Sequence, residues 1–283
     1  MIPGEKLSIN KTCDNLQVSK SGYYDWKKRK EPKDADKKIR KEIQGIALEF
    51  PFYGYKRVSK ELHHRNKQVN HKKVYRIMKE EKLLCRRKKK FKPVTTQSNH
   101  GLRTYPNLAK DLKVTGLNQL WVSDITYIQL LREVVYLAVI IDLFSRKCIG
   151  WCLSRSLDTQ LTLGALNMAI EKRKKFGFAK LIHHSDRGVQ YASDAYVERL
   201  KQIGALISMS RKGNVYDNAF AESFMKTLKV EEVYMNEYET MEDAYINIKH
   251  FIEKVYNKKR LHSSIGYLPP NKFEQEVLNN CVI

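Results

Sequence analysis

The segment Trp121-Val122-Ser123-Asp124-Ile125-Thr126-Tyr127 is built mainly of β-branched and aromatic residues, which are typical of a buried strand. A carboxylate, Asp124, stands in the middle of it. Burying an unpaired carboxylate is costly unless a cation or hydrogen-bond donors accompany it. The segment therefore predicts a strand whose acidic residue has partners elsewhere in the chain.

Further elements of strand and helix length follow this segment along the chain. β-branched and aromatic runs predict three consecutive antiparallel strands, at residues 120–130, 134–144 and 147–153. We then expect a helix at 158–175, a strand at 181–184, a helix at 193–203, a strand at 205–209 and helices at 217–229 and 242–256. The order β-β-β-α-β-α-β-α is that of a ribonuclease-H-like fold. We expect an α/β core with a mixed five-stranded sheet and flanking helices.

Two further acidic residues are candidates for a site with Asp124. Asp186 follows the short strand that ends in His183-His184-Ser185, where the carboxyl end of a sheet strand delivers side chains to a crevice. Glu222 lies on the helix that begins near Asp217. Two carboxylates from strands and one from a helix can hold two Mg²⁺ ions roughly 3.5–4 Å apart, which activates an attacking oxygen and stabilises a leaving one.

Each acidic residue also has a simpler explanation. Asp186 could cap the following turn, Glu222 could face solvent, and Asp124 could hydrogen-bond a neighbouring strand. Asp142 is a rival for the metal site, but it ends its strand, where capping a turn is less costly. His183 and His184 suggest a metal pair; because adjacent strand residues face opposite ways, we expect ordinary packing for at least one of them.

The charge of the chain points to a polyanionic partner. Lys and Arg outnumber Asp and Glu by 53 to 31, a net charge of +22. The first 100 residues hold 28 basic and 11 acidic side chains, so +17 of that charge lies in the first third. Such an excess favours nucleic acid through counterion release, although a solvated basic tail is the alternative. We expect this third to grip double-stranded DNA.

The composition also excludes several classes of protein. The longest apolar run, Val134 to Ile141, is far shorter than the roughly 20 residues of a membrane span, and no signal peptide is visible. The five cysteines include no C-x-x-C pair, so neither a disulfide framework nor a cysteine-rich zinc site is indicated. We expect a cytoplasmic protein that does not associate with membranes.

A small all-α helix-turn-helix domain is predicted at residues 36–84. Apolar residues recur at helical spacing over 36–50 and 58–62, and Asn70 can cap a third helix. Helical hairpins with basic faces also occur in proteins that bind no DNA. On the third helix, the cations outside the apolar stripe, which we expect to contact DNA, are Lys72, Lys73, Arg76 and Lys79.

Basic segments flank this domain. Residues 1–35 mix cations with Tyr23, Tyr24 and Trp26, which suits phosphate binding or base stacking but also a local packing anchor. Residues 85–114 are expected to be a linker that tracks the DNA backbone. Its unbroken run of cations is Arg86, Arg87, Lys88, Lys89 and Lys90.

The motifs resemble those of one family, the insertion-sequence transposases with a D-D-35-E core, specifically the second-reading-frame (OrfB) products of the IS-three family. They stand at Trp121–Tyr127, His184–Gly188 and Gly213–Phe224, with a fourth at Tyr256–Pro270. Between Asp186 and Glu222 lie 35 residues, the spacing after which the family is named. The match covers nearly the whole chain, which would place an integrase-like catalytic core at 115–230 and a C-terminal helical extension at 231–283.

The resemblance implies metal-dependent DNA cleavage and strand transfer. Asp124, Asp186 and Glu222 would be the metal ligands, for two Mg²⁺ ions that Mn²⁺ could replace. Lys229 lies on the helix face of Glu222 and can reach a phosphate beside the metals, and Asn218 shares that face unless it caps the helix. The DNA contacts expected in this part of the chain are Lys229, Lys226, Asn218, Arg260 and His262.

The resemblance also implies partners. In this family a frameshift fusion commonly supplies an upstream DNA-binding module, which is not visible in this chain, so an upstream-frame protein or fusion is a possible partner. A homo-oligomer is expected in the synaptic complex, because two element ends must be brought together. Two alternatives stay open: a non-catalytic DNA-binding partner or inhibitor of the fused transposase, and a ribonuclease-H-like nuclease or junction resolvase.

Overall fold

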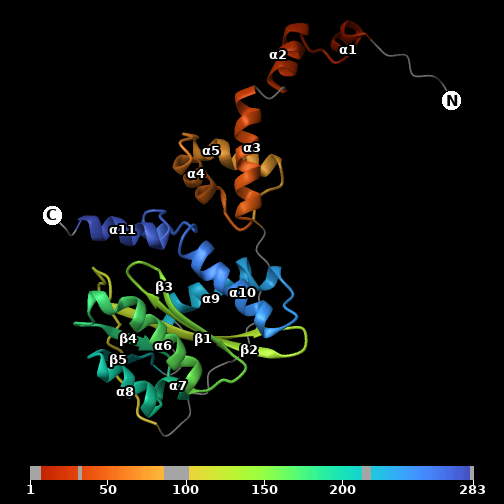
Figure 1. Ribbon diagram of the computed structural model, residues 1–283. Helices are drawn as coiled ribbons and strands as arrows, with labels where there is room; N and C mark the ends of the chain where they lie inside the picture. The colour runs from red at the N-terminus through yellow and green to blue at the C-terminus, as the bar shows by residue number, and fades with distance from the viewer. Residues whose placement is uncertain (1–7, 31–33, 86–101, 212–217, 281–283) are drawn as a thin grey trace. The chain divides into compact units, whose positions relative to one another are not determined.

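The computed structural model describes residues 8–30, 34–85, 102–211 and 218–280. The chain divides into two compact units, Met1–Arg87 and Lys88–Ile283 (Figure 1). The run Arg86 to Lys90, predicted to contact DNA, lies outside the described residues.

The first unit is helical. Its helices are α1 (Ile9–Asn15), α2 (Lys20–Lys30), α3 (Asp34–Glu49), α4 (Tyr55–His64) and α5 (His71–Glu80). Helices α3, α4 and α5 enclose a small core that includes the fully buried side chains of Ile46, Leu62 and Ile77. The Asn70 side chain accepts a hydrogen bond from Lys72 N at 2.9 Å, as predicted for the cap of the third helix.

The first two helices were not predicted. Apolar periodicity reveals a helix when one of its faces is buried. Most side chains described in α1 and α2 are instead exposed, among them Tyr24 and Trp26. The rings of Tyr23 and Trp26 lie 6.1 Å apart. This small aromatic cluster is compatible with both roles considered for it, stacking and local packing.

The second unit contains a five-stranded mixed sheet. Its strands are β1 (Leu120–Gln129), β2 (Val134–Asp142), β3 (Cys148–Ser154), β4 (Ile182–Ser185) and β5 (Leu206–Met209), in the order β3-β2-β1-β4-β5. Strands β3, β2 and β1 are antiparallel, whereas β1, β4 and β5 are parallel. This arrangement confirms the predicted ribonuclease-H-like core.

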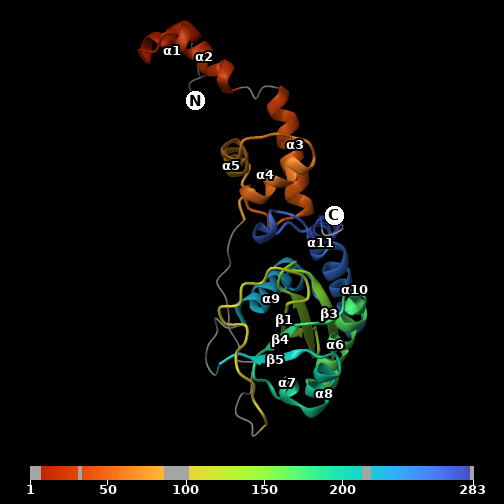
Figure 2. The same ribbon diagram turned by 90° about the vertical axis from the view of Figure 1, so that its left-hand side faces the viewer.

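Helices cover both faces of this sheet (Figures 1 and 2). The helices of this unit are α6 (Thr159–Arg173), α7 (Val189–Ala192), α8 (Asp194–Gln202), α9 (Ala219–Glu231), α10 (Met241–His250) and α11 (Pro270–Asn280), with a π-helical turn at Phe251–Tyr256. One core cluster contains residues of α9 and α10, and the other contains residues of α6, α7 and α8. Gly150 of β3 allows α6 to approach closely, because a Cβ there would lie 2.2 Å from Ala165 O.

Part of the predicted linker lies against the sheet of the second unit. Leu108 N donates a hydrogen bond of 2.8 Å to Ser208 Oγ on β5, and Tyr105 packs against the core cluster of that face. Residues 102–114 therefore belong to the second unit.

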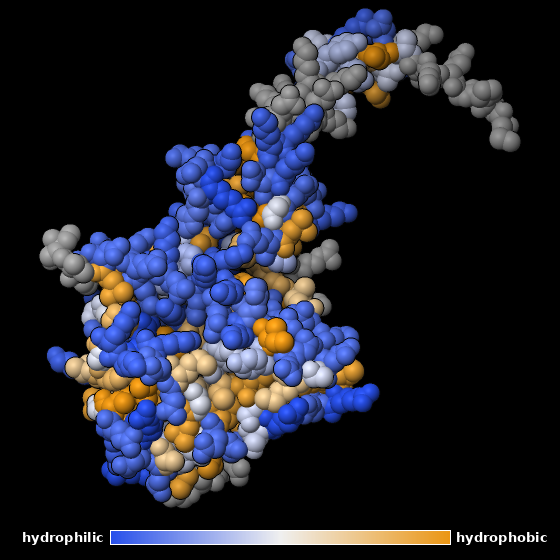
Figure 3. All heavy atoms as spheres, viewed as in Figure 1, coloured by the Kyte–Doolittle hydropathy of each residue, from blue (hydrophilic) through white to orange (hydrophobic). Residues whose placement is uncertain are grey.

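The surface of the chain is largely hydrophilic on the face drawn in Figure 3. Among the described helices, none combines the length and apolar character needed to span a bilayer.

Candidate active site

The central strand holds the first candidate carboxylate. Asp124 lies in the middle of β1, opposite Val139 of β2, and its side chain is partly buried. Its Oδ1 accepts a hydrogen bond of 3.0 Å from Ile125 N. One hydrogen bond from the adjacent residue does not offset the cost of burying a carboxylate. Asp124 therefore still requires a cation, as its sequence context predicted.

The second carboxylate comes from the neighbouring parallel strand. Val122 of β1 pairs with His184 of β4, so Asp124 and Asp186 each stand two residues beyond that pair on adjacent strands. Asp186 Oδ1 also accepts a hydrogen bond of 2.9 Å from Gly188 N, which caps the turn after β4. The capping considered for Asp186 is therefore present, and it coexists with a position beside Asp124.

Helix α9 supplies the third carboxylate. Asn218, at the start of this helix, donates a hydrogen bond from Nδ2 to Ser123 O at 3.2 Å and so ties the helix to β1 next to Asp124. Glu222, on the first turn, is exposed. The structure shows no capping hydrogen bond from the Asn218 side chain. Asn218 thus positions α9, and its buried side chain is not presented to DNA as expected.

The three carboxylates influence one another electrostatically. The pKa of Asp124 is raised to about 8, first by burial and then by the charges of Asp186 and Glu222. Lys229 opposes this rise, since its positive charge lowers the pKa of Asp124. The Lys229 ammonium lies 4.3 Å from the centre of the Tyr127 ring, and burial lowers the pKa of Lys229. The site therefore holds more negative charge than its protein cation neutralises.

The donor set suits a hard divalent cation, because carboxylate oxygens are the ligands that Mg²⁺ prefers. In the part of the chain that the structure describes, no three acidic, His or Cys side chains already converge closely enough to hold a metal ion. Carboxylates of like charge repel one another. The three side chains thus fit a cation in chemistry and in position on the fold, and they must draw together to bind it.

A buried polar network surrounds His183 and His184 of β4. Sequence patterns did not reveal it. His183 Nε2 and the Tyr196 hydroxyl hydrogen-bond at 2.9 Å, while His184 contacts Ser208 and Ser210 at 2.8 and 3.1 Å. Burial lowers the pKa of His183 to about 3, so this ring is neutral. Both histidines are packing residues, as predicted for at least one of them.

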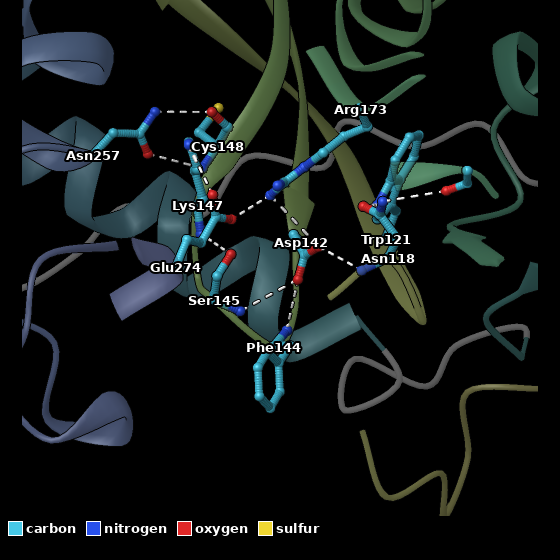
Figure 4. Close-up of polar contacts among 11 residues, drawn as sticks. Asn118, Trp121, Asp142, Phe144, Ser145, Lys147, Cys148, Arg173, Asn257 and Glu274 are labelled. Carbon is cyan, nitrogen blue, oxygen red and sulfur yellow. Dashed lines mark hydrogen bonds and ion pairs between the residues drawn. The ribbon is translucent and has the colours of Figure 1, made fainter. Parts of the chain in front are cut away.

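Asp142 is excluded from the candidate metal site. Its Oδ1 accepts hydrogen bonds from Phe144 N and Ser145 N, and its Oδ2 accepts one from Asn118 N (Figure 4). Arg173 lies 3.6 Å from the same carboxylate. The turn-capping role predicted for Asp142 is confirmed.

The cations of α5 fall into two groups. Lys72 and Lys79 are exposed. Lys73 instead pairs with Asp36 at 2.5 Å, and Arg76 lies 3.6 Å from the same carboxylate and 3.9 Å from Glu80. The acidic partners neutralise part of the charge that was expected to face DNA, and Asp36 lies on α3, so reading α5 alone could not reveal it.

The two cations of the C-terminal motif are buried. The Arg260 guanidinium forms two hydrogen bonds with Glu231, at 2.8 and 2.7 Å, and is 4% exposed. His262 is 8% exposed and packs against the Tyr256 ring at 4.8 Å between centroids. Both residues hold the C-terminal segment to the core, so the structure does not present them to DNA. Lys226 remains exposed on α9.

Comparison with known families defines the class of protein. Residues 115–215 and 203–270 match families described as integrase core domains, and residues 33–91 match a family described as an HTH-like domain. The chain is therefore an enzyme of the integrase and transposase class, with the fold of a DDE polynucleotidyl transferase and an attached helix-turn-helix domain.

Relatives narrow this class to a family. The uncharacterized 31 kDa protein of insertion element IS600 from Shigella sonnei is 37% identical over 269 residues, which cover 93% of this chain and 97% of the relative. The transposase InsF for insertion sequence IS3A from Escherichia coli strain K12 is 36% identical over 279 residues, 96% of either chain. The chain belongs to the IS3 family of insertion-sequence transposases.

Solved structures with a similar core are more distant. The catalytic core domain of BIV integrase is 18% identical, with a TM-score of 0.41 over 59% of this chain and 99% of that one. The HTLV-2 integrase catalytic core domain in complex with magnesium is 16% identical, with a TM-score of 0.39 over 52% of this chain and 91% of that one.

Proposed function

We propose that this transposase cleaves and joins DNA strands at the ends of its insertion sequence in a reaction that needs Mg²⁺. Asp124, Asp186 and Glu222 are the proposed metal ligands. The observation that carries the proposal is the placement of the three acids: Asp124 and Asp186 each stand two residues beyond the paired Val122 and His184, and the Asn218 hydrogen bond to Ser123 ties the helix of Glu222 to β1. A site that accumulates negative charge on a rigid sheet gains most from a divalent cation.

Each part of the site has a separate task. Bound Mg²⁺, in two ions that Mn²⁺ could replace, would polarise the phosphodiester and stabilise the attacking and leaving oxygens. Asp124 and Asp186 supply ligands from the sheet, and Asn218 holds α9 so that Glu222 completes the set. Lys229 lies at the edge of the site, where its ammonium can contact a DNA phosphate.

The DNA is proposed to bind both units. In the first unit, four cations of α5 would contact the duplex backbone. Lys72 and Lys79 are exposed, and Lys73 and Arg76 both lie near Asp36. In the second unit, Lys226 and Lys229 follow Glu222 along α9. We propose a homo-oligomer for the complex that joins two element ends, and an upstream-frame product as a further partner.

The proposal is tested with the full chain, Mg²⁺ and labelled duplexes that carry the sequence flanking the reading frame. Nicked and joined products are expected for the unaltered protein. Asp124→Asn, Asp186→Asn and Glu222→Gln should each lower their yield by at least about a hundredfold, because several kcal/mol of transition-state stabilisation depend on the metal. Asp194→Asn, an exposed acid on α8, is the matched control.

The products separate the proposal from its rivals. Hydrolysis without joined strands would indicate a nuclease. Full activity in any of the three carboxylate variants would remove the metal-ligand assignment. An inactive chain that still binds these duplexes and competes with a fused transposase would indicate a non-catalytic regulator.

A further inference from the structure

A cavity of about 520 Å³ is lined in part by residues of β1 and α9, the two elements that carry Asp124 and Glu222. Its walls include Leu120 and Val122 of β1, Phe144 and Arg146 of the turn between β2 and β3, Phe220 of α9 and Phe273 of α11. Alternate residues of a strand share a face, so Val122 and Asp124 point to the same side of β1, about 7 Å apart along the strand. Phe220 and Glu222 share the first turn of α9. The cavity and the candidate active site therefore share two elements, β1 and α9.

Arg146 brings a positive charge to this cavity, whose other charged lining residues, Lys110 and Asp111, lie 3.8 Å from each other. Its guanidinium lies 4.5 Å from the centre of the Phe220 ring, and burial lowers its pKa. Its Nε is buried and has no hydrogen-bond partner. Within the described part of the chain, no carboxylate forms an ion pair with it. A partly buried cation of this kind is costly to maintain unless a ligand anion completes its coordination.

The neighbouring charges of the same turn are all paired, as Figure 4 shows. Asp142 lies 3.6 Å from Arg173, and Lys147 lies 2.8 Å from Glu274 of α11. Glu274 also pairs with Arg173. The turn thus keeps one cation, Arg146, without an acidic partner among the described residues, and this cation lines the cavity.

The turn is also held rigidly, which a binding site requires. Asn257 accepts a hydrogen bond from Cys148 N and donates one to Cys148 O, at 3.0 and 2.9 Å (Figure 4). Arg146 has a positive φ of 63°, a conformation that non-glycine residues rarely adopt. The polar contacts around the turn maintain this conformation, so the fold fixes the backbone from which the Arg146 side chain projects.

We propose that the cavity binds one unpaired nucleotide of the DNA strand next to the scissile phosphate. Arg146 would contact its phosphate, and Phe220 and Phe144 would stack on its base. Aromatic rings with a nearby arginine are typical of sites for single-stranded nucleic acid. The volume lies within the roughly 300–1,000 Å³ of pockets that hold a small molecule, which suits one nucleotide. The identity of the ligand rests on the proposed function, because that function brings a DNA strand to Asp124.

Photocrosslinking of the full chain tests this proposal. The probe is a forked duplex whose unpaired strand carries a single 5-iododeoxyuridine, bound in EDTA so that no cleavage occurs. Crosslinks are expected on the peptides that contain Phe220 or Phe144. Phe220→Leu should lower their yield at least about fivefold, since the base would lose its stacking on an aromatic ring. Phe220 is 47% exposed, so this change is compatible with the fold.

Two further variants separate the charge from the fold. Arg146→Asn removes the cation and should also lower the crosslink yield, and asparagine tolerates the positive φ at this position. Arg132→Gln removes an exposed cation elsewhere on the second unit and should leave the yield unchanged. Crosslinks that map away from the cavity, or full yields in both Arg146→Asn and Phe220→Leu, would overturn the proposal.

The carboxylate variants distinguish this inference from the proposed function. Asp124→Asn should abolish Mg²⁺-dependent products and retain the crosslink, because the cavity does not use that carboxylate. If cleavage survives in Asp124→Asn while the crosslink persists, the metal assignment fails and the nucleotide site stands. If cleavage is lost in Asp124→Asn and the unaltered chain gives no crosslink in the cavity, the nucleotide site fails alone.

Discussion

The carboxyl group of Asp124 is expected to link metal binding to pH. Its pKa of about 8 means that the metal-free protein holds a proton there at neutral pH. A cation must displace this proton, so the apparent affinity for Mg²⁺ should fall about tenfold for each pH unit below 8. Isothermal titration with Mg²⁺ between pH 6 and 9 measures this slope, and Asp124→Asn should remove it. An affinity that is independent of pH would contradict the site.

The same proton affects the stability of the metal-free fold. The pKa of Asp124 is raised above the roughly 3.9 of an unfolded chain. Its contribution to stability is therefore fully present below about pH 4 and is lost as pH rises through 8. Melting in EDTA between pH 4 and 9 should show this loss, and Asp124→Asn should raise the melting temperature at pH 8. An unchanged or lower melting temperature in this variant would contradict the raised pKa.

Lys229 is expected to tune the acidity of the site. Its positive charge lowers the pKa of Asp124, so Lys229→Gln should move the midpoint of Mg²⁺ binding to a higher pH. Lys226→Gln is the matched control, because this lysine is exposed one turn earlier on α9. The measurement is the same titration without DNA. Equal midpoints in the two variants would mean that Lys229 acts only on DNA.

At the scale of elements, α11 is expected to stabilise the core through one buried acid. Glu274 is 5% exposed and pairs with Lys147 and with Arg173, which is itself 2% exposed. Removing one partner of a buried ion pair leaves an uncompensated charge, which costs about 3–5 kcal/mol. Glu274→Gln should therefore lower the free energy of unfolding in urea by that order. Glu276→Gln, exposed on the same helix, should change it little.

At the scale of the whole molecule, DNA affinity is expected to depend mainly on the first third of the chain. Each neutralised phosphate contributes about −0.9 to the slope of log affinity against log salt. Residues 1–100 carry +17 of the net charge and should show a steep slope, whereas residues 101–283 should show a shallow one. Binding of both fragments and of the whole chain to one duplex measures the slopes. Equal slopes for residues 101–283 and the whole chain would mean that the positive charge of residues 1–100 is only a solvated surface that does not bind DNA.

Local patterns in the sequence were sufficient for the order of strands in the second unit and for the family. Strand and helix periods extend over a few residues, and the buried strand around Asp124 needs only its own composition to be identified. The spacing between Asp186 and Glu222 is likewise a property of the chain. The positions of these acids on adjacent elements follow from the predicted sheet.

Only the tertiary structure showed which polar groups are already paired. Arg260 and Lys73 looked equivalent to the exposed lysines, yet Glu231 and Asp36, distant in sequence, neutralise them. The cavity beside β1 likewise forms between segments that meet only in the folded chain, and Arg146 carried no signal in the sequence. The physical reason is that burial and ion pairing depend on contacts between distant residues, whereas periodicity and motif spacing are written along the chain itself.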